Sequence, residues 1–236
     1  MAASREDRPA ELREGRPAEL REGRPVALHE AQLAALRGME PALIVVDVQR
    51  SFADPEMIAD YEPDFDAVAA AVKATGALVN AARAAGVTVA WVELGSDPAQ
   101  PWRASQWLRT GDPAAPYGPE EPCVAGTPGA QWYGTGPADG EIRVVKRGYS
   151  GFLGTDLEAA LREAGIGWVA VCGLTTECCV AATATDAFQL GWPVLLPVDA
   201  VAAYQREVHE SSLSALAMNV AVLTGGDELA DLWVTA

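Results

Sequence analysis

The clearest structural signal begins at residue 41, where short apolar runs start to alternate with amphipathic stretches. Such apolar runs are typical of strands buried on both faces, and the longer amphipathic stretches are typical of helices that cover a parallel sheet. The sequence therefore predicts an α/β fold with a single doubly wound, mostly parallel sheet of about six strands and helices on both faces. The expected strands cover residues 42–48, 87–94, 142–146, 168–172, 193–198 and 220–223, and the expected helices cover residues 65–85, 156–164, 177–190, 207–218 and 228–234.

The N-terminal region differs from the rest of the chain in its composition. Residues 8–15 and 16–23 are identical octapeptides, and a third copy starts at Arg24. Each copy contains a Pro and a Gly, so the segment cannot form one continuous helix, and it offers few apolar side chains to bury. No apolar stretch typical of a signal peptide precedes the repeat. We expect residues 1–26 to form a low-complexity, disordered tail and residues 27–236 to form the folded domain.

The charge balance limits the classes of partner. The chain contains 17 Lys and Arg residues against 33 Asp and Glu residues, which gives a net charge of −16. This charge disfavours binding to nucleic acid and to anionic membrane surfaces. No uninterrupted apolar run approaches the roughly 18 residues that a membrane helix needs. The four cysteines, at positions 123, 172, 178 and 179, do not form a spaced disulfide framework, so we expect a soluble cytoplasmic protein.

Three chemically reactive side chains fall where strands are expected to end, which is where ligands bind in doubly wound sheets. Asp47 follows a buried run, Lys146 ends the run 142–146, and Cys179 lies at the start of the helix after the run 168–172. Near a helix N-terminus the backbone N–H groups lower the pKa of a thiol and favour the thiolate. The alternatives are a turn-capping aspartate, a solvated lysine and a thiol that is simply buried in the core, which is the usual state of a free cysteine.

Three ordered motifs carry a resemblance to a known family. They are similar to motifs of the isochorismatase-like cysteine hydrolases, which include N-carbamoylsarcosine amidase, biuret hydrolase, ureidoacrylate hydrolase and nicotinamidase. The resemblance covers roughly residue 41 to the C-terminus. The motifs are Ile44-Val-Val-Asp47-Val-Gln49-Arg-Ser-Phe52, Val145-Lys146-Arg-Gly-Tyr149-Ser-Gly-Phe152-Leu-Gly-Thr155-Asp156-Leu157 and Gly173-Leu-Thr-Thr176-Glu-Cys-Cys179-Val180.

The resemblance implies a catalytic triad of Asp47, Lys146 and Cys179, with Cys179 as the nucleophile because it directly precedes Val180. It also implies a cis peptide between Leu174 and Thr175, and an oxyanion hole formed by the N–H groups of Thr175 and Cys179. The implied activity is hydrolysis of an amide or ureido C–N bond through a thioester on Cys179. Relatives of this kind commonly form dimers or tetramers, so we expect a homo-oligomer.

Seven further side chains are candidate substrate-binding residues. Gln49, Phe52, Tyr149 and Phe152 lie in the motifs, and Trp102 and Trp132 lie in the irregular segment 95–140, which we interpret as a pocket wall or lid. The tryptophans either stack on a planar substrate or pack the segment, and packing is the simpler interpretation. Arg206 either binds a substrate carboxylate or lies in solvent on the first turn of a helix.

The sequence departs from the nicotinamidases at their metal site. Those enzymes carry an Asp-x-His segment after the second strand, whereas here Asp97 is followed by Pro and Ala, and the sole histidines are His29 and His209. We therefore expect no metal ion and no cofactor. Isochorismatases that cleave a vinyl ether do not use the cysteine, so Cys179 favours C–N hydrolysis. The alternatives are a vinyl-ether hydrolase, a thiol redox protein that uses the Cys178–Cys179 pair, and a non-catalytic protein of the same fold.

Overall fold

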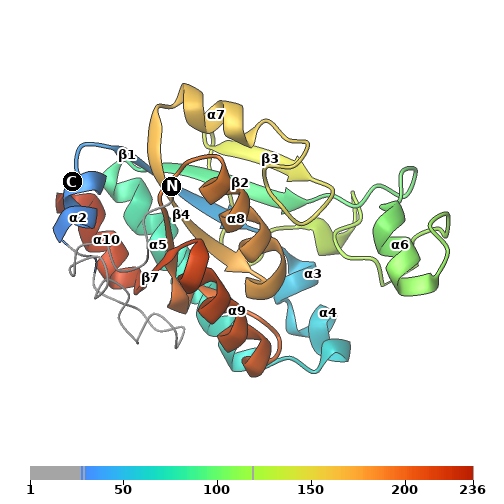
Figure 1. Ribbon diagram of the computed structural model, residues 1–236. Coiled ribbons are helices and arrows are strands. Elements are labelled where there is room, and N and C mark those ends of the chain that lie inside the picture. Colours follow the sequence, from blue (N-terminus) through green and yellow to red (C-terminus); the bar gives the residue numbers. More distant parts are fainter. Residues whose placement is uncertain (1–27, 29, 119, 236) are drawn as a thin grey trace, which may run out of the picture.

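A computed structural model describes residues 28, 30–118 and 120–235, so the expectation for the tail at residues 1–26 lies outside the described residues. The sheet runs in the order β3-β2-β1-β4-β5-β7, β6 pairs with β4, and every pairing is parallel (Figure 1). This arrangement confirms the predicted single parallel sheet. The strands are β1 (Glu40–Val46), β2 (Thr88–Leu94), β3 (Ile142–Lys146), β4 (Ile166–Leu174), β5 (Val194–Pro197), β6 (Val201–Ala202) and β7 (Val222–Thr224).

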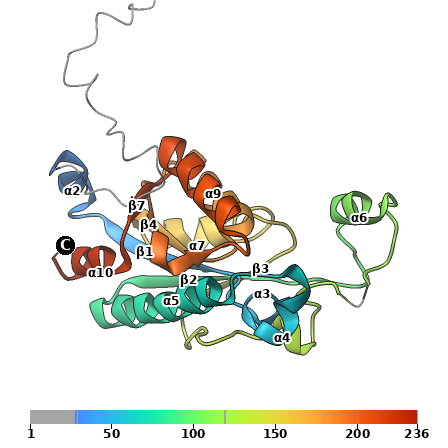
Figure 2. The ribbon, with the colours of Figure 1, turned by 90° about the horizontal axis from the view of Figure 1, so that it is seen from below.

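Helices cover both faces of the sheet, with α5 on one face and α7 and α9 on the other (Figure 2). The helix predicted over residues 177–190 begins instead with a π-helical turn at Thr176–Val180 and continues as α8. The helices are α2 (Glu30–Leu36), α3 (Arg50–Ala53), α4 (Pro55–Ile58), α5 (Phe65–Ala85), α6 (Arg103–Thr110), α7 (Leu157–Glu163), α8 (Ala181–Gln189), α9 (Arg206–Asn219) and α10 (Gly226–Thr235).

The long helix α5 has the bounds that the sequence predicts, and its ends have clear local causes. The side chain of Asp64 accepts a hydrogen bond from the N–H of Ala67, and Gly86 ends the helix in a left-handed conformation. By length and composition alone α5 is long and apolar enough to cross a membrane. One face of α5 packs against the sheet, however, as the helical spacing of its buried residues requires. These residues are Val68, Ala71, Val72, Thr75, Leu78, Val79 and Ala82.

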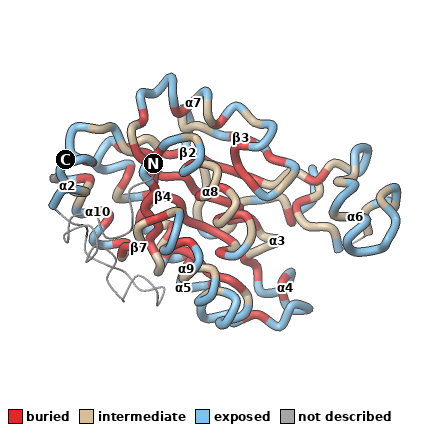
Figure 3. The backbone as a smooth tube through the Cα atoms, in the orientation of Figure 1, coloured by how far each residue is buried: buried red, intermediate tan, exposed pale blue. Residues whose placement is uncertain are grey.

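The carboxyl ends of β1 and β4 lie side by side at the point where the strand order reverses. The chain moves outward through β2 and β3 on one side of β1, and through β4, β5 and β7 on the other. In such sheets the crevice at this point binds ligands. Gly173 allows the two strands to approach here, because a Cβ at this position would lie 2.0 Å from the carbonyl oxygen of Val46. The central strands are buried over most of their length (Figure 3).

The segment 95–140 is more ordered than the sequence suggests. It contains α6 and a 3-10 turn at Pro128–Ala130, and backbone bridges join Gln49 to Trp132 and Ser96 to Val124. Figures 1 and 2 show α6 standing away from the body of the protein. Its Trp107 and Leu108 side chains are 60% and 72% exposed. The role of this segment as a lid stays a prediction.

Candidate active site

Asp47 lies directly after β1, fully buried, at the crevice between β1 and β4. Its backbone is left-handed, with φ of 50°, and its N–H donates to the carbonyl oxygen of Val92 at 2.8 Å. The Nζ atom of Lys146 lies 2.8 Å from Oδ2 of Asp47, and both side chains are fully buried. Among the described residues, no group donates a well-aligned hydrogen bond to either carboxylate oxygen. The ion pair is therefore the main compensation for burying this charge.

Lys146 contacts both the Asp47 carboxylate and the Cys179 thiol. Its Nζ atom donates to the carbonyl oxygen of Gly148 at 2.9 Å and to Sγ of Cys179 at 3.3 Å. Burial lowers the pKa of Lys146, but its interactions with Asp47 and Cys179 together raise it by more, so its pKa lies above the ordinary value. For Asp47, burial raises the pKa, and the charge of Lys146 opposes that effect. The structure thus brings the three predicted catalytic residues together.

Cys179 lies in the π-helical turn Thr176–Val180 after β4 and is 7% exposed. The N–H groups of Cys178 and Val180 both donate to the carbonyl oxygen of Thr175 at 3.2 Å, which closes the turn around the thiol. The peptide between Leu174 and Thr175 is cis, as the resemblance implies.

The predicted lowering of the Cys179 pKa is wrong. The Sγ atom of Cys178 lies 4.0 Å from that of Cys179, and this contact, burial and the negative charge of Asp47 all raise the pKa of Cys179, while Lys146 opposes them. These local effects outweigh the backbone dipoles of one helical turn. The resting site therefore holds a thiol, and the chemistry needs a neighbouring base. Asp47, with its raised pKa, is placed to be that base.

Gln49 is fully buried, but its amide is occupied by the protein itself. Its Nε2 atom donates to the carbonyl oxygens of Leu94 and Ala130 at 3.1 and 3.0 Å, and its Oε1 atom accepts from the N–H of Leu94 at 2.9 Å. Gln49 therefore joins the end of β2 to the segment 95–140. Both N–H groups of its amide are used by the protein itself, and its role in substrate binding stays a prediction.

Three other candidates lie outside the immediate site. Phe52 packs against the core, and its carbonyl oxygen accepts from the hydroxyl of Tyr204 at 3.3 Å. Phe152 is buried and stacks on Trp192 with ring centroids 5.8 Å apart, which corrects its prediction as a substrate contact. Arg206 is exposed and pairs with Glu210 within α9 at 2.8 Å, so the solvated interpretation of Arg206 holds.

The aromatic candidates divide into two groups. Trp132 packs edge-on against Trp91 with centroids 4.9 Å apart, which supports the packing interpretation. Trp102 packs edge-on against Tyr149 at 4.8 Å, and the Tyr149 ring is 46% exposed.

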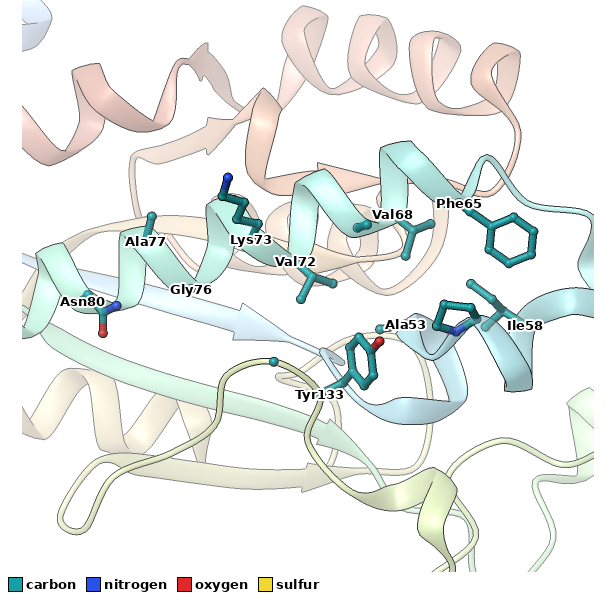
Figure 4. A pocket seen from close by; sticks show the side chains of 13 residues that line it. Ala53, Ile58, Phe65, Val68, Val72, Lys73, Gly76, Ala77, Asn80 and Tyr133 are labelled. Atoms are coloured by element: carbon teal, nitrogen blue, oxygen red, sulfur yellow. The ribbon is translucent and has the colours of Figure 1, made fainter.

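A cavity of about 370 Å³ lies beside Cys178. Sequence reasoning missed three of its lining residues, Glu177, Thr185 and Asp186, because helical spacing alone does not show that α8 borders a cavity. Its described lining is Tyr149, Glu177, Cys178, Ala181, Ala182, Thr185 and Asp186. A second cavity, a groove of about 520 Å³, runs along α5 between Phe65 and Asn80 (Figure 4). None of the three catalytic candidates lines that groove.

The described residues do not fit a metal centre of the kind expected in nicotinamidases. Within residues 30–118 and 120–235, no group of three or more His, Cys, Asp or Glu side chains is placed to hold a metal ion. Asp97 instead pairs with Arg147 at 3.3 Å, and Nδ1 of His209 lies 2.9 Å from Oγ1 of Thr176. We derive no catalytic step through a metal.

Comparison with known proteins gives consistent matches. The family model of the isochorismatase domain matches residues 41–228. A ureidoacrylate amidohydrolase from Azorhizobium caulinodans is 34% identical over 68% of this chain and 75% of its own length. A streptothricin hydrolase from Streptomyces noursei is 37% identical over 72% of this chain and 57% of its own length. The structure of N-carbamoylsarcosine amidase from Thermoplasma acidophilum matches with a TM-score of 0.64 and 25% identity, covering 80% of this chain and 98% of that one.

Proposed function

Because this chain belongs to the isochorismatase family and is a hydrolase of C–N bonds, we propose that it is a metal-independent cysteine amidohydrolase acting through a Cys179 thioester. Its proposed substrate is a small amide or a ureido or carbamoyl compound. Three of the matched proteins are an amidohydrolase, a hydrolase and an amidase by name, which supports this reaction class.

One contact carries the proposal. Nζ of Lys146 lies 2.8 Å from the Asp47 carboxylate and 3.3 Å from the Cys179 sulfur, and all three side chains are buried. A base, a fixed cation and a thiol in contact are the parts that an activated nucleophile requires. A purely structural ion pair does not require a thiol at its cation.

The first half of the reaction forms the thioester. Asp47 accepts the proton of the Cys179 thiol as the sulfur attacks the carbonyl carbon, and Lys146 stabilises the negative charge that remains in the site. The N–H groups of Thr175 and Cys179 are proposed to stabilise the tetrahedral oxyanion, a contribution worth on the order of 100-fold or more in rate per donor. The protonated Asp47 then gives its proton to the leaving nitrogen as the C–N bond breaks.

The second half releases the acid. Asp47, again ionised, accepts a proton from a water molecule whose oxygen attacks the thioester carbon. The C–S bond breaks, and the Cys179 sulfur regains a proton from Asp47. The products are the amine or ammonia and a carboxylic or carbamic acid, so atoms and charge balance.

We expect ammonia release from at least one member of a panel of biuret, N-carbamoyl amino acids, ureidoacrylate-like acids and simple carboxamides. The chemistry proposed here uses only groups of the protein itself, so turnover is expected to be the same with and without a chelator. The measurement is steady-state ammonia production by the full-length protein. Turnover that a chelator removes and zinc restores contradicts metal independence, and a folded protein that releases no ammonia from any member contradicts the amidohydrolase assignment.

A further inference from the structure

The cavity of about 370 Å³ beside Cys178 adjoins the proposed reaction centre. Cys178 lines this cavity, and its sulfur lies 4.0 Å from that of Cys179. Asp47, the proposed base, interacts with the Cys179 thiol, so the proposed function places the carbonyl carbon of a substrate at Cys179. A substrate whose carbonyl carbon is at Cys179 can therefore extend past Cys178 into this cavity.

The charge on the cavity wall has one sign. Glu177 and Asp186 line it, and no Lys, Arg or His is among its described lining residues. Oε1 of Glu177 accepts from the hydroxyl of Thr175 at 2.7 Å, and Oδ1 of Asp186 accepts from the amide of Gln189 at 3.3 Å. Neither carboxylate forms an ion pair within the described part of the chain.

Four arginines of the described structure are paired with carboxylates other than Glu177 and Asp186. Arg109, whose charge acts on Tyr149, pairs with Glu121. The other three pairs are Arg50 with Asp54, Arg147 with Asp97, and Arg206 with Glu210. Glu177 also acts on His209, whose pKa burial lowers below its ordinary value. Neither Glu177 nor Asp186 has a paired cation within the described part of the chain.

Tyr149 adds an aromatic surface to the same wall, because its ring is 46% exposed and borders the cavity. An aromatic face attracts ammonium and guanidinium groups. Building on the proposed function, we propose that this cavity is a substrate subsite for a positively charged group, so that the preferred substrate is a cationic amide or ureido compound. Glu177 and Asp186 are the specificity-determining residues.

The proposed preference for a cationic substrate distinguishes this chain from the matched ureidoacrylate amidohydrolase. A substrate with a carboxylate next to its ureido group would bring that charge toward Glu177 and Asp186, and like charges repel at such short range. Arg206, the residue predicted to bind a substrate carboxylate, pairs with Glu210 in solvent instead. A cationic substrate avoids both difficulties.

The first test compares three amides of equal length that end in an ammonium, a methyl or a carboxylate group. The expected order of kcat/KM is cationic, then neutral, then anionic, and salt reduces the difference. We expect Glu177→Gln and Asp186→Asn each to lower the ratio of cationic to neutral kcat/KM about two- to fivefold. Glu163→Gln is the matched control, because it removes the same charge from an exposed position on α7 and should leave the ratio unchanged.

The second test needs no turnover, so it separates this inference from the proposed function. In the Cys179→Ala protein, Cys178 is labelled by methanethiosulfonates that carry an ammonium or a sulfonate group. The Cys178 thiolate attacks the sulfenyl sulfur, a mixed disulfide forms and methanesulfinate leaves. Cys123 and Cys172 are buried and serve as internal controls. The thiolate fraction of Cys178 affects both reagents equally, so the ratio of their rates reports the local charge.

We expect the ratio of the cationic to the anionic labelling rate to be about fivefold or more higher for Cys178 than for free cysteine. We expect Glu177→Gln to remove about two- to fivefold of that gain. A ratio equal to that of free cysteine, or one unchanged by both acidic substitutions, overturns the inference whether or not the enzyme releases ammonia. A charge-selective ratio in a protein that releases no ammonia from any amide supports the subsite and contradicts the proposed function alone.

Discussion

We expect Cys179→Ala to lower ammonia release on the order of 10⁴-fold or more, because loss of a nucleophile removes the covalent route entirely. The variant should fold normally, since the substitution removes one sulfur from a nearly closed site and leaves the Asp47–Lys146 ion pair intact. The measurement is kcat/KM for the best substrate of the panel, with circular dichroism as the check on folding.

Cys178→Ala is the matched control, because it removes the same atom from the neighbouring residue. Lys146 contacts the sulfur of Cys179, and no such contact with Cys178 is present in the described structure, so we expect most of the activity to remain. Loss of activity in Cys178→Ala with retention in Cys179→Ala would assign the nucleophile to Cys178. Equal loss in both variants, together with a parent activity that depends on a reductant, would instead favour thiol redox chemistry.

The second large effect concerns stability. Lys146→Met leaves the Asp47 carboxylate fully buried without its cation, and breaking a buried pair in this way typically costs about 3–5 kcal/mol. The loss is measured by urea unfolding near neutral pH. Lys73→Met is the control: Lys73 is the one other lysine in the sequence and is exposed on α5, so its replacement should change stability by less than about 0.5 kcal/mol.

The pH dependence of this loss has a definite sign. Burial already raises the pKa of Asp47 above its ordinary value of 3.8, and Lys146→Met removes the charge that opposes this rise. The penalty is therefore full above the raised folded-state pKa and shrinks as the pH falls through it, because the folded protein then takes up a proton more readily than the unfolded chain. Asp47→Asn in the Lys146→Met background should recover stability at neutral pH. A penalty that neither acid nor Asp47→Asn reduces contradicts the uncompensated-charge explanation.

Local sequence patterns predicted the features that depend on local causes. Apolar runs located the six main strands, and the helical period predicted α5, whose ends the structure shows to be capped by Asp64 and Gly86. The positions of Asp47, Lys146 and Cys179 at strand ends made them candidates, because the carboxyl ends of parallel strands lie along one edge of the sheet. The family resemblance then implied that the three meet, as the structure shows.

Features that depend on long-range contacts could not be predicted in the same way. The Gln49 amide is occupied by Leu94 and Ala130, which are 45 and 81 residues away in sequence. Phe152 packs in the core against Trp192, which lies 40 residues later in the sequence. The short strand β6 forms through its pairing with β4. The Cys179 pKa is set by the adjacent Cys178 and by burial, and then by Asp47 and Lys146 from two other strand ends, rather than by the backbone dipoles of its own turn.

The proposed thioester on Cys179 is tested most directly by rapid acid quench during turnover, followed by mass spectrometry of the peptide that contains Cys178 and Cys179. The account predicts an added mass equal to the acyl part of the substrate on Cys179, absent from Cys179→Ala and removed by hydroxylamine. An enzyme that turns over at full rate with no adduct at any time point, or with the adduct on Cys178, would contradict it.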